Sequence, residues 1–429
     1  MRILRLRAYF YPESVSTSAL FEDVEDELAR RKIFGVNYTP VPSRGITDEV
    51  RKEYKKKRYE ELRDGYMTVY RFPMIKEGTN FAQRTLKYLL CTVAEYFKGI
   101  KENDIDVVFG SSTPPTQGML CAKVAKKLSK KCGKKVPFVF CLQDIFPDSL
   151  VTAGMTKKGS LIWKIGRKIE DYSYRGADKI IVISEDFKKN IMEKGVPENK
   201  IVVVPNWGDT DGIYPVERKD NVLFDRYNLD RDKFYISYSG NVGYTQNMDL
   251  LLDTAKAVRD ELCDVRFVII GEGVAKADVE RRIKEEAIDN VILLPFQPYE
   301  DIAYVFSLGD VGLIISKSGV GNSSLPCKTY GYMAAEKPIL TSFDRESELS
   351  SLIEAVGCGM TAEANNKDEL ADAIRNMTAD TSLSEKGKRG KAYLDTELDK
   401  EKCAKKYVDT LVSVLPETQQ ENVKKTVKL

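Results

Sequence analysis

Short runs of β-branched and other apolar residues alternate with longer amphipathic stretches along most of the chain. Such runs are typical of buried parallel strands, and the amphipathic stretches between them are typical of crossover helices. The first half offers strand candidates at residues 3–6, 107–109, 136–142, 180–184 and 201–204. The second half offers candidates at residues 234–239, 265–270, 291–294, 311–315 and 339–342. The pattern therefore predicts two separate α/β sheets.

Two domains are also expected from length, because 429 residues exceed what one hydrophobic core usually supports. A stretch rich in Pro, Gly, Asn and Asp without periodicity follows Pro205, so we place the boundary at residue 208. The predicted domains are residues 1–208 and 209–397. Residues 398–416 predict a helix that packs back across the domains, since one helical face carries Ala404, Tyr407, Val408, Leu411 and Leu415. The polar tail, residues 417–429, is expected to be frayed.

Two segments of the first half receive a more specific prediction. Residues 40–80 are the least regular part, and we expect an insertion there that faces the acceptor of the reaction. Residues 86–97 place apolar side chains on one helical face, which favours a helix with that face toward the core.

Composition removes several classes of function. The 67 basic and 65 acidic residues give a net charge of +2, so no global field indicates nucleic-acid binding. The eight cysteines are scattered without a CxxC pair, as in a reduced cytoplasmic protein. No signal peptide or membrane span is evident, and the chain is expected to be cytoplasmic and at most peripheral to a membrane. The absence of histidine excludes His-based triads and His-metal sites.

Two glycine turns follow strand candidates in the second half. The first contains Gly240, Asn241 and Gly243, and the second contains Gly271 and Gly273. Glycines between a strand and a helix let the backbone approach a phosphate, and the helix N-terminus offers unpaired N–H groups. A diphosphate is therefore the expected ligand. Taken alone, the first motif is explained equally well as a tight turn that binds no ligand. Neither turn has the full dinucleotide pattern, which argues against an NAD enzyme.

A third candidate loop runs from the strand at 311–315 into a helix that is expected to start near Pro326. Ser323 and Ser324 can bind anionic oxygens, and Lys328 adds a fixed positive charge beside them. A lysine in the first turn of a helix is electrostatically unfavourable unless an anion lies there. An exposed lysine without a ligand is the alternative.

Three further features have a functional and a structural interpretation. Asp144, at the end of a strand candidate, could act as a base or cap a turn before Pro147. Asp209 and Asp211 form a DxD triplet, which we interpret as a solvated turn rather than a metal site, so no metal or other cofactor is expected. The seven lysines between Lys123 and Lys135 would line a solvated helix or contact an anionic membrane surface.

Taken in order, the motifs resemble those of the family 4 glycosyltransferases, particularly the bacterial branch that builds cell-surface polysaccharides. The resemblance covers residues 2 to about 415 and rests on AYFYPE, VYRFP, LQDIFPDS, the segment at 177–207, GNVG, IIGEG, LLPFQPYED and LPCKTYGYMAAEKPIL. It implies a GT-B fold, in which two Rossmann-like domains face a central cleft. It also implies retaining transfer of a hexosyl or N-acetylhexosaminyl group from a nucleotide sugar, most often a UDP-sugar.

The same resemblance assigns the candidate residues. The loop matching Gly240 to Gly243 would face the diphosphate, and the stretch matching Pro295 to Tyr299, with Phe296, would lie against the base. The region matching Ser323 to Gly331, with Ser324 and Lys328, would hold phosphate and ribose. On the acceptor side it implies the loop that contains Tyr11, Glu13 and Ser16. The acceptor would be a saccharide, free or linked to a polyprenyl carrier, used for O-antigen, capsule or exopolysaccharide.

Three departures from the family pattern bear on activity. The paired glutamates of the family would fall at Ser323 and Gly331, and neither is acidic. The family's Arg and Lys at the glycine loop are Asn241 and Gln246 here, which leaves Lys328 to stabilise the leaving group. Gln143 stands where many members have histidine before the acid. A non-catalytic partner subunit of another transferase is therefore one alternative, and a UDP-sugar epimerase is disfavoured because its known chemistry employs histidine.

Overall fold

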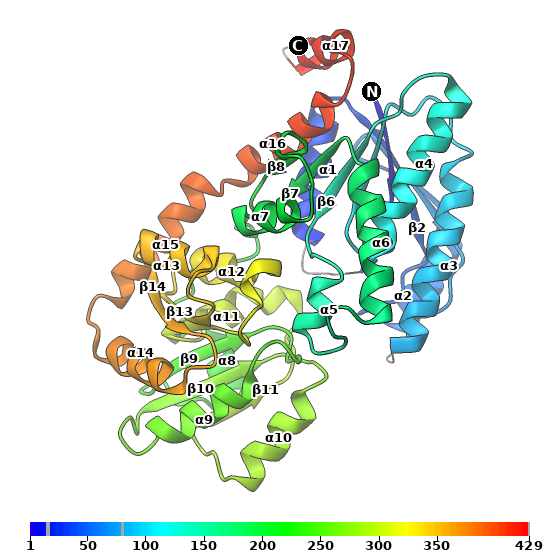
Figure 1. The fold of residues 1–429 in the computed structure, drawn as a ribbon. Helices are drawn as coiled ribbons and strands as arrows, with labels where there is room; N and C mark the ends of the chain where they lie inside the picture. The colour runs from blue at the N-terminus through cyan, green and yellow to red at the C-terminus, as the bar shows by residue number, and fades with distance from the viewer. Residues whose placement is uncertain (14–17, 79–80, 428–429) are drawn as a thin grey trace. The chain divides into compact units, whose positions relative to one another are not determined.

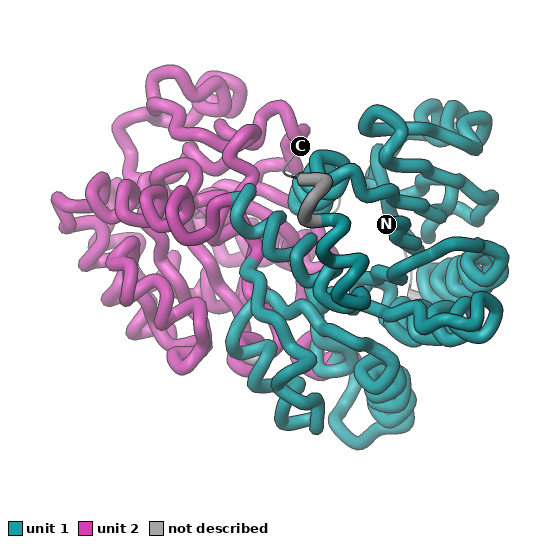
Figure 2. The backbone as a smooth tube through the Cα atoms, turned by 90° about the horizontal axis from the view of Figure 1, so that it is seen from above, with its two compact units in different colours: residues 1–150, 156–205, 400–429 teal, residues 151–155, 206–399 magenta. Residues whose placement is uncertain are grey.

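The computed structural model describes residues 1–13, 18–78 and 81–427. The chain divides into two compact units, coloured separately in Figure 2. The first comprises residues 1–150, 156–205 and 400–429, and the second comprises residues 151–155 and 206–399. The main division thus falls between residues 205 and 206, beside the boundary that the sequence places at 208.

The first unit is built on an eight-stranded sheet with the order β3-β4-β2-β1-β5-β6-β7-β8. All neighbours pair in parallel except β3 and β4, which are antiparallel. In chain order the strands are β1 (Arg2–Leu6), β2 (Phe34–Pro40), β3 (Tyr59–Leu62), β4 (Met67–Phe72), β5 (Val107–Ser111), β6 (Phe138–Leu142), β7 (Lys179–Val182) and β8 (Ile201–Val203).

Helices cover this sheet, and Figure 1 labels most of them. Helices α3, α4 and α6 lie side by side over one face, because α4 contacts both of the others and the three pack on β1, β2, β5 and β6. The helices of the unit before residue 206 are α1 (Ser18–Arg30), α2 (Asp48–Lys56), α3 (Phe81–Gly99), α4 (Gln117–Cys132), α5 (Asp148–Thr152), α6 (Leu161–Gly176) and α7 (Glu185–Glu193).

The second unit has a six-stranded parallel sheet with the order β11-β10-β9-β12-β13-β14. Its strands are β9 (Phe234–Ser239), β10 (Val265–Ile270), β11 (Val291–Leu294), β12 (Val311–Ile315), β13 (Ile339–Phe343) and β14 (Gly359–Glu363). Its helices are α8 (Val222–Arg226), α9 (Met248–Val258), α10 (Lys276–Glu285), α11 (Ile302–Ser307), α12 (Lys328–Ala334), α13 (Glu348–Val356), α14 (Lys367–Ala379) and α15 (Leu383–Glu397).

Alternate residues of the central strands enter two different hydrophobic clusters. Ile236 and Tyr238 of β9 belong to one cluster, whereas Tyr235 belongs to the other. Both faces of the sheet are thus buried, which explains why its strands read as continuous apolar runs in the sequence.

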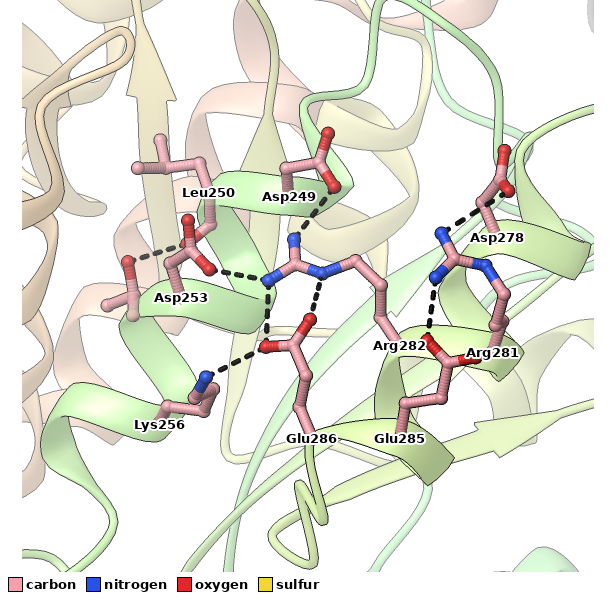
Figure 3. Close-up of polar contacts among 10 residues, drawn as sticks. Asp249, Leu250, Asp253, Lys256, Asp278, Arg281, Arg282, Glu285 and Glu286 are labelled. Carbon is pink, nitrogen blue, oxygen red and sulfur yellow. Dashed lines mark hydrogen bonds and ion pairs between the residues drawn. The ribbon is translucent and has the colours of Figure 1, made fainter.

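Outside the core, an ion-pair network joins helices α9 and α10 (Figure 3). The guanidinium of Arg282 donates to Asp249, Asp253 and Glu286, with N···O distances of 2.6–2.8 Å. Lys256 donates to the same Glu286 carboxylate at 2.8 Å. These bonds raise the pKa of Arg282 and lower that of Glu286 to about 2. The network fixes the two helices that follow the glycine loops.

All ten strands expected from the sequence are present, but four others were missed. Strands β2, β3 and β4 escaped because polar side chains interrupt them, as Asn37 and Thr39 do on β2 although both are fully buried. Strand β14, with the sequence GMTAE, lacks a run of β-branched or large apolar residues. Residues 40–80 are more regular than the sequence indicates, since this segment contains α2 and two strands that extend the sheet. That an insertion here faces the acceptor stays a prediction.

The helix expected at residues 86–97 exists as α3, but the prediction that its apolar face meets the core is wrong. Leu86, Val93 and Phe97 are 52–56% exposed, whereas Lys87 and Glu95 are fully buried. The apolar periodicity located the helix correctly. The opposite face packs on the sheet, because it carries a cluster of buried polar side chains.

The end of the chain returns to the first unit. Helix α16 (Lys400–Ser413) contacts α1 and β7, and Arg31, directly after α1, donates to Asp409 at 2.5 Å. Tyr407 is fully buried and its hydroxyl lies 3.0 Å from the sulfur of Cys141. The segment expected to be a frayed tail forms α17 (Glu417–Val427), and the side chain of Gln420 donates to the carbonyl of Leu415 at 2.7 Å.

Candidate functional site

Each sheet has a point where the direction of its strand order reverses. In the second sheet this point lies between β9 and β12, which are neighbours there. Ligands of open parallel sheets bind at the carboxyl ends of the strands at such a point. The loops that follow β9 and β12 contain the GNVG and SSLPCK motifs, so the topology brings together two of the motifs predicted from the sequence.

Helix α12 places Lys328 beside the first glycine loop. The hydroxyl of Tyr332 donates to the carbonyl of Ser237 at 2.6 Å and accepts from the N–H of Ser239 at 3.0 Å, which fixes the helix against β9. One turn earlier, the amine of Lys328 lies 3.5 Å from the ring centroid of Tyr238. A Cβ on Gly240 would lie only 3.2 Å from this amine, so the glycine leaves room for the lysine.

The environment of Lys328 favours its neutral form. Desolvation lowers the pKa of its amine to about 7. The residue as a whole is half-buried, protein atoms surround its amine, and no carboxylate in the described ranges forms a salt bridge with it. A cation held at a helix start without a counter-charge is stabilised when an anionic ligand binds.

Most of the N–H groups of the first glycine loop are used within the protein. The N–H groups of Gly240 and Val242 donate to the carbonyls of Ile270 and Glu272, each at 2.9 Å, and that of Gly243 donates to the side chain of Gln246 at 3.1 Å. Asn241 Nδ2 also lies 3.3 Å from Gln246. The loop is therefore preorganised, but it offers fewer free N–H groups than the glycine pattern indicates.

Gly271 and Gly273 have a packing role in the second turn. A Cβ on Gly271 would lie 1.9 Å from the carbonyl oxygen of Gly240, and one on Gly273 would lie 2.2 Å from that of Val242. The two glycines thus allow the neighbouring loops to pack backbone against backbone. Both glycines are predicted to lie at the donor site, and the close packing of the two loops is a second reason for glycine at these positions.

The third loop, between β12 and α12, is anchored by an aspartate that was not among the predicted residues. The carboxylate of Asp344 accepts from the N–H groups of Gly319 and Gly321, both at 2.8 Å. Ser323 is buried and bonds back to Val320, whereas Ser324 is partly exposed. Ser324 is therefore the more accessible of the two predicted serines.

Neither position of the expected glutamate pair could accept an acid without rearrangement. Ser323 is 3% exposed, and a Cβ on Gly331 would lie 2.5 Å from the ring of Phe306. Helix α12 packs directly on this ring. The local packing therefore depends on the serine and the glycine that stand in place of the two glutamates.

An aromatic surface follows β11. Phe296 is 70% exposed and Tyr299 is 57% exposed, and between them Gln297 is buried and donates to Tyr227 and to the carbonyl of Pro295. The anchored glutamine holds the loop while the two rings stay accessible. This geometry would allow a planar group to stack on Phe296.

In the first unit, the loop after β1 contains the predicted acceptor-side residues. Tyr11 is 63% exposed, but Glu13 is 2% exposed and accepts from the N–H groups of Ser43 and Arg44 at 2.8 and 2.9 Å. Burial raises the pKa of Glu13, against the opposing effect of these bonds. Glu13 thus ties two loops together. Ser16 lies outside the described residues.

Asp144 follows β6 at the same edge of the first sheet. Its N–H donates to the hydroxyl oxygen of Ser112 at 3.2 Å, and the residue as a whole is exposed although protein atoms surround its carboxylate. The protein around it desolvates the carboxylate and raises its pKa to about 6, despite hydrogen bonds with Ser149 and Ile145. Such a pKa suits a general base near neutral pH. The adjacent Gln143 donates instead to Tyr407 at 3.2 Å.

A second polar cluster in the first unit was missed. Tyr9 donates to Glu77 at 2.7 Å, and the buried Lys87 donates to the same carboxylate at 2.8 Å. Arg44 lies 5.3 Å above the ring of Tyr9. A lysine within the apolar run LKYLL is the signal that could have indicated such a buried partner.

No metal site is evident among the described residues. No group of three or more His, Cys, Asp or Glu side chains in these ranges could hold an ion. Asp209 of the DxD triplet accepts from the hydroxyl of Tyr299 and from the N–H of Gly212 at 3.0 Å, which fixes a turn.

Comparison with known proteins assigns both units. Residues 43–211 match the family described as Glycosyltransferase Family 4, and residues 220–392 match Glycosyl transferases group 1. The putative colanic acid biosynthesis glycosyl transferase WcaI of Escherichia coli is 25% identical over 370 residues, 85% of this chain and 88% of that protein. The probable glycosyltransferase WbjE of Pseudomonas aeruginosa is 28% identical over 237 residues, and the match spans 55% of this chain and 58% of that protein.

The fold is shared with solved glycosyltransferase structures. Anabaena HepE in complex with UDP superposes with a TM-score of 0.69 at 14% identity, covering 96% of this chain and 100% of that one. The predicted class, α/β with two Rossmann-like domains of the GT-B type, is confirmed. The expected family is confirmed as well: this chain belongs to the family 4 glycosyltransferases with the GT-B fold.

Proposed function

We propose that this chain is a retaining transferase in surface polysaccharide synthesis, which moves a sugar from a UDP-sugar donor to a saccharide acceptor.

 The acceptor saccharide is free or linked to a polyprenyl carrier. The relative named for colanic acid biosynthesis supports the assignment to polysaccharide synthesis. The UDP bound to the HepE structure supports a uridine nucleotide as the donor.

One observation carries the donor half of the proposal. Lys328 presents an amine without a carboxylate partner, next to Gly240 and at the start of α12. A nucleoside diphosphate would supply the missing negative charge. In the reaction, the bond between the anomeric carbon and the diphosphate oxygen breaks, and Lys328 stabilises the charge that develops on the departing diphosphate.

The acceptor half rests on Asp144. A bond forms between the acceptor hydroxyl oxygen and the anomeric carbon, and the hydroxyl proton passes to the Asp144 carboxylate. A pKa of about 6 keeps this carboxylate ionised at neutral pH and close to the pH at which it can accept a proton. Tyr11, which is largely exposed in the same unit, would contribute to the acceptor surface.

In this proposal Lys328 supplies the positive charge that stabilises the departing diphosphate. We therefore propose transfer without a metal or another cofactor. We also propose that the enzyme acts on the cytoplasmic side of the membrane, where the lysines between Lys123 and Lys135 would contact anionic lipid.

The test measures donor binding and transfer separately. Thermal unfolding is recorded with a panel of nucleoside diphosphates and nucleotide sugars, without added metal, for the wild type and for Lys328→Ala. Lys367→Ala is the matched control, because Lys367 is exposed and also opens a helix of the second unit. We expect one nucleotide to raise the melting temperature of the wild type and of the Lys367→Ala control. The same nucleotide should not change the melting temperature of Lys328→Ala.

A second candidate is a non-catalytic partner subunit, and the packing around Gly331 favours it because an acid has no room there. Donor hydrolysis or transfer by the purified chain would exclude this candidate. A chain that binds no nucleotide in the panel would contradict the catalytic proposal and support the partner subunit. The epimerase alternative has no structural support, since the chain contains no histidine.

A further inference from the structure

Helix α3 is inverted relative to an ordinary surface helix. Its buried face carries Lys87, Cys91 and Glu95, which are spaced four residues apart and have no exposed surface. Glu95 accepts from the side chain of Gln117 at 2.9 Å and from the thiol of Cys91 at 3.3 Å. The polar groups of the helix are therefore satisfied from inside the unit.

The outward face of α3 is apolar. Five large apolar side chains among the described part of this helix are 42–56% exposed, and they are Leu86, Leu89, Leu90, Val93 and Phe97. Residues 86 and 97 are eleven positions apart, so this stripe is about 16 Å long. Soluble proteins rarely leave contiguous apolar surface of this kind in water, and such patches mark a site of interaction.

The neighbouring helices add positive charge and further apolar groups. On α4, Lys126, Lys127 and Lys130 are exposed and form no salt bridge with any described residue. On α6, Leu161 and Ile162 are 75% and 55% exposed. Helices α3, α4 and α6 are packed side by side over one face of the sheet (Figure 1). Their exposed apolar side chains and lysines therefore belong to the outer surface of one helix layer.

We infer that the outer surface of α3, α4 and α6 docks on an anionic lipid bilayer, with the α3 stripe inserted among the lipids. Uncompensated lysines beside an apolar helix face complement acidic headgroups above hydrocarbon, whereas an apolar protein partner would leave them without counter-charges. No described helix is long and apolar enough to cross a membrane, which fits contact along the surface. The inference extends the lysine contact proposed above.

The experiment measures vesicle binding by the full chain without any transfer, so docking and catalysis can fail independently. Sedimentation is compared for vesicles of phosphatidylcholine alone and vesicles that also contain phosphatidylglycerol. The test variant is Leu89→Gln with Val93→Gln, because both side chains are exposed and glutamine keeps the helix. The matched control is Met192→Gln with Val222→Gln, which alters exposed apolar residues on α7 and α8.

We expect the wild type and the control to bind phosphatidylglycerol vesicles and the α3 variant to bind them about 10-fold more weakly. Replacing Lys126, Lys127 and Lys130 by glutamine should weaken binding mainly at low salt. Equal binding by the wild type and the α3 variant, or no binding by either, would overturn the inference. So would an α3 variant that changes only the oligomeric state in light scattering, which would indicate an interface between copies of this chain.

Discussion

At the scale of single residues, Lys328 combines a cost in stability with a proposed function. Because desolvation depresses its pKa to about 7, the folded state disfavours the charged amine that the unfolded chain carries. Its contribution is most unfavourable at pH values below 7 and disappears as the pH rises toward 10.4, the usual pKa of lysine. Functional groups are often retained at such a cost.

We therefore expect Lys328→Met to raise the melting temperature of the free protein by about 2–4 °C at neutral pH. This gain should shrink toward zero near pH 10, and the variant should lose the stabilisation by nucleotide. Thermal unfolding at several pH values, with and without nucleoside diphosphate, measures both effects. A variant less stable than the wild type throughout this range would show that Lys328 stabilises the free protein.

Asp144 gives a second residue-scale prediction. If its carboxylate accepts the acceptor proton, kcat/KM should rise with pH through about 6, since only the ionised form is competent. Asp144→Asn should lower kcat by about 100-fold or more and remove this acid limb, while nucleotide binding stays unchanged. Steady-state rates from pH 5 to 8 provide the measurement. An Asn variant that keeps the acid limb would assign the titration to another group.

At the scale of elements, the two glycine turns of the second unit behave as one structure. The sequence presents two separate glycine motifs, but the second supports the first because its backbone packs against the carbonyls of Gly240 and Val242. The apolar runs in the sequence predicted the strands before both turns. They could not predict the contact between turns, which depends on the parallel pairing of β9 and β10.

Gly271→Ala should therefore disturb the first loop as well. The new Cβ would lie 1.9 Å from the carbonyl oxygen of Gly240, so the backbone must move, and we expect a loss of about 2 kcal/mol or more with weaker nucleotide binding. Val274→Ala is the control, because it lies in the same turn and shortens a side chain that is 66% exposed. Denaturant unfolding compares the two. Equal stability of both variants would contradict the proposed contact.

At the scale of the whole molecule, the chain passes through the second unit before its last segment, residues 400–429, returns to the first. Helix α16 covers α1 and β7 with side chains that are separated from them by more than 200 positions in the sequence. Tyr407 at its centre is fully buried and its hydroxyl contacts Cys141 and Gln143. The sequence predicted this helix and its buried face, and the structure identifies the unit that it joins.

Tyr407→Ala should destabilise the first unit by about 3–5 kcal/mol, as expected for the loss of a large buried aromatic side chain. Hydrogen exchange should then become faster in β6 and β7 and stay unchanged in β9 and β10. Lys406→Ala, at the neighbouring exposed position, should leave both sheets protected. Faster exchange in the second sheet to the same degree would mean that α16 stabilises both units.

The sequence by itself determined the two α/β sheets, ten of their strands, the glycine turns and the candidate lysine, because these depend on local apolar runs and turn residues. Only the tertiary structure decided which face of α3 is buried, which N–H groups of the glycine loop remain free, and where the last helix packs. Each of these depends on partners distant in sequence, such as Gln117 for Glu95 or Ile270 for Gly240. A buried polar partner can outweigh an apolar pattern, since an unpaired buried charge costs more free energy than an exposed leucine.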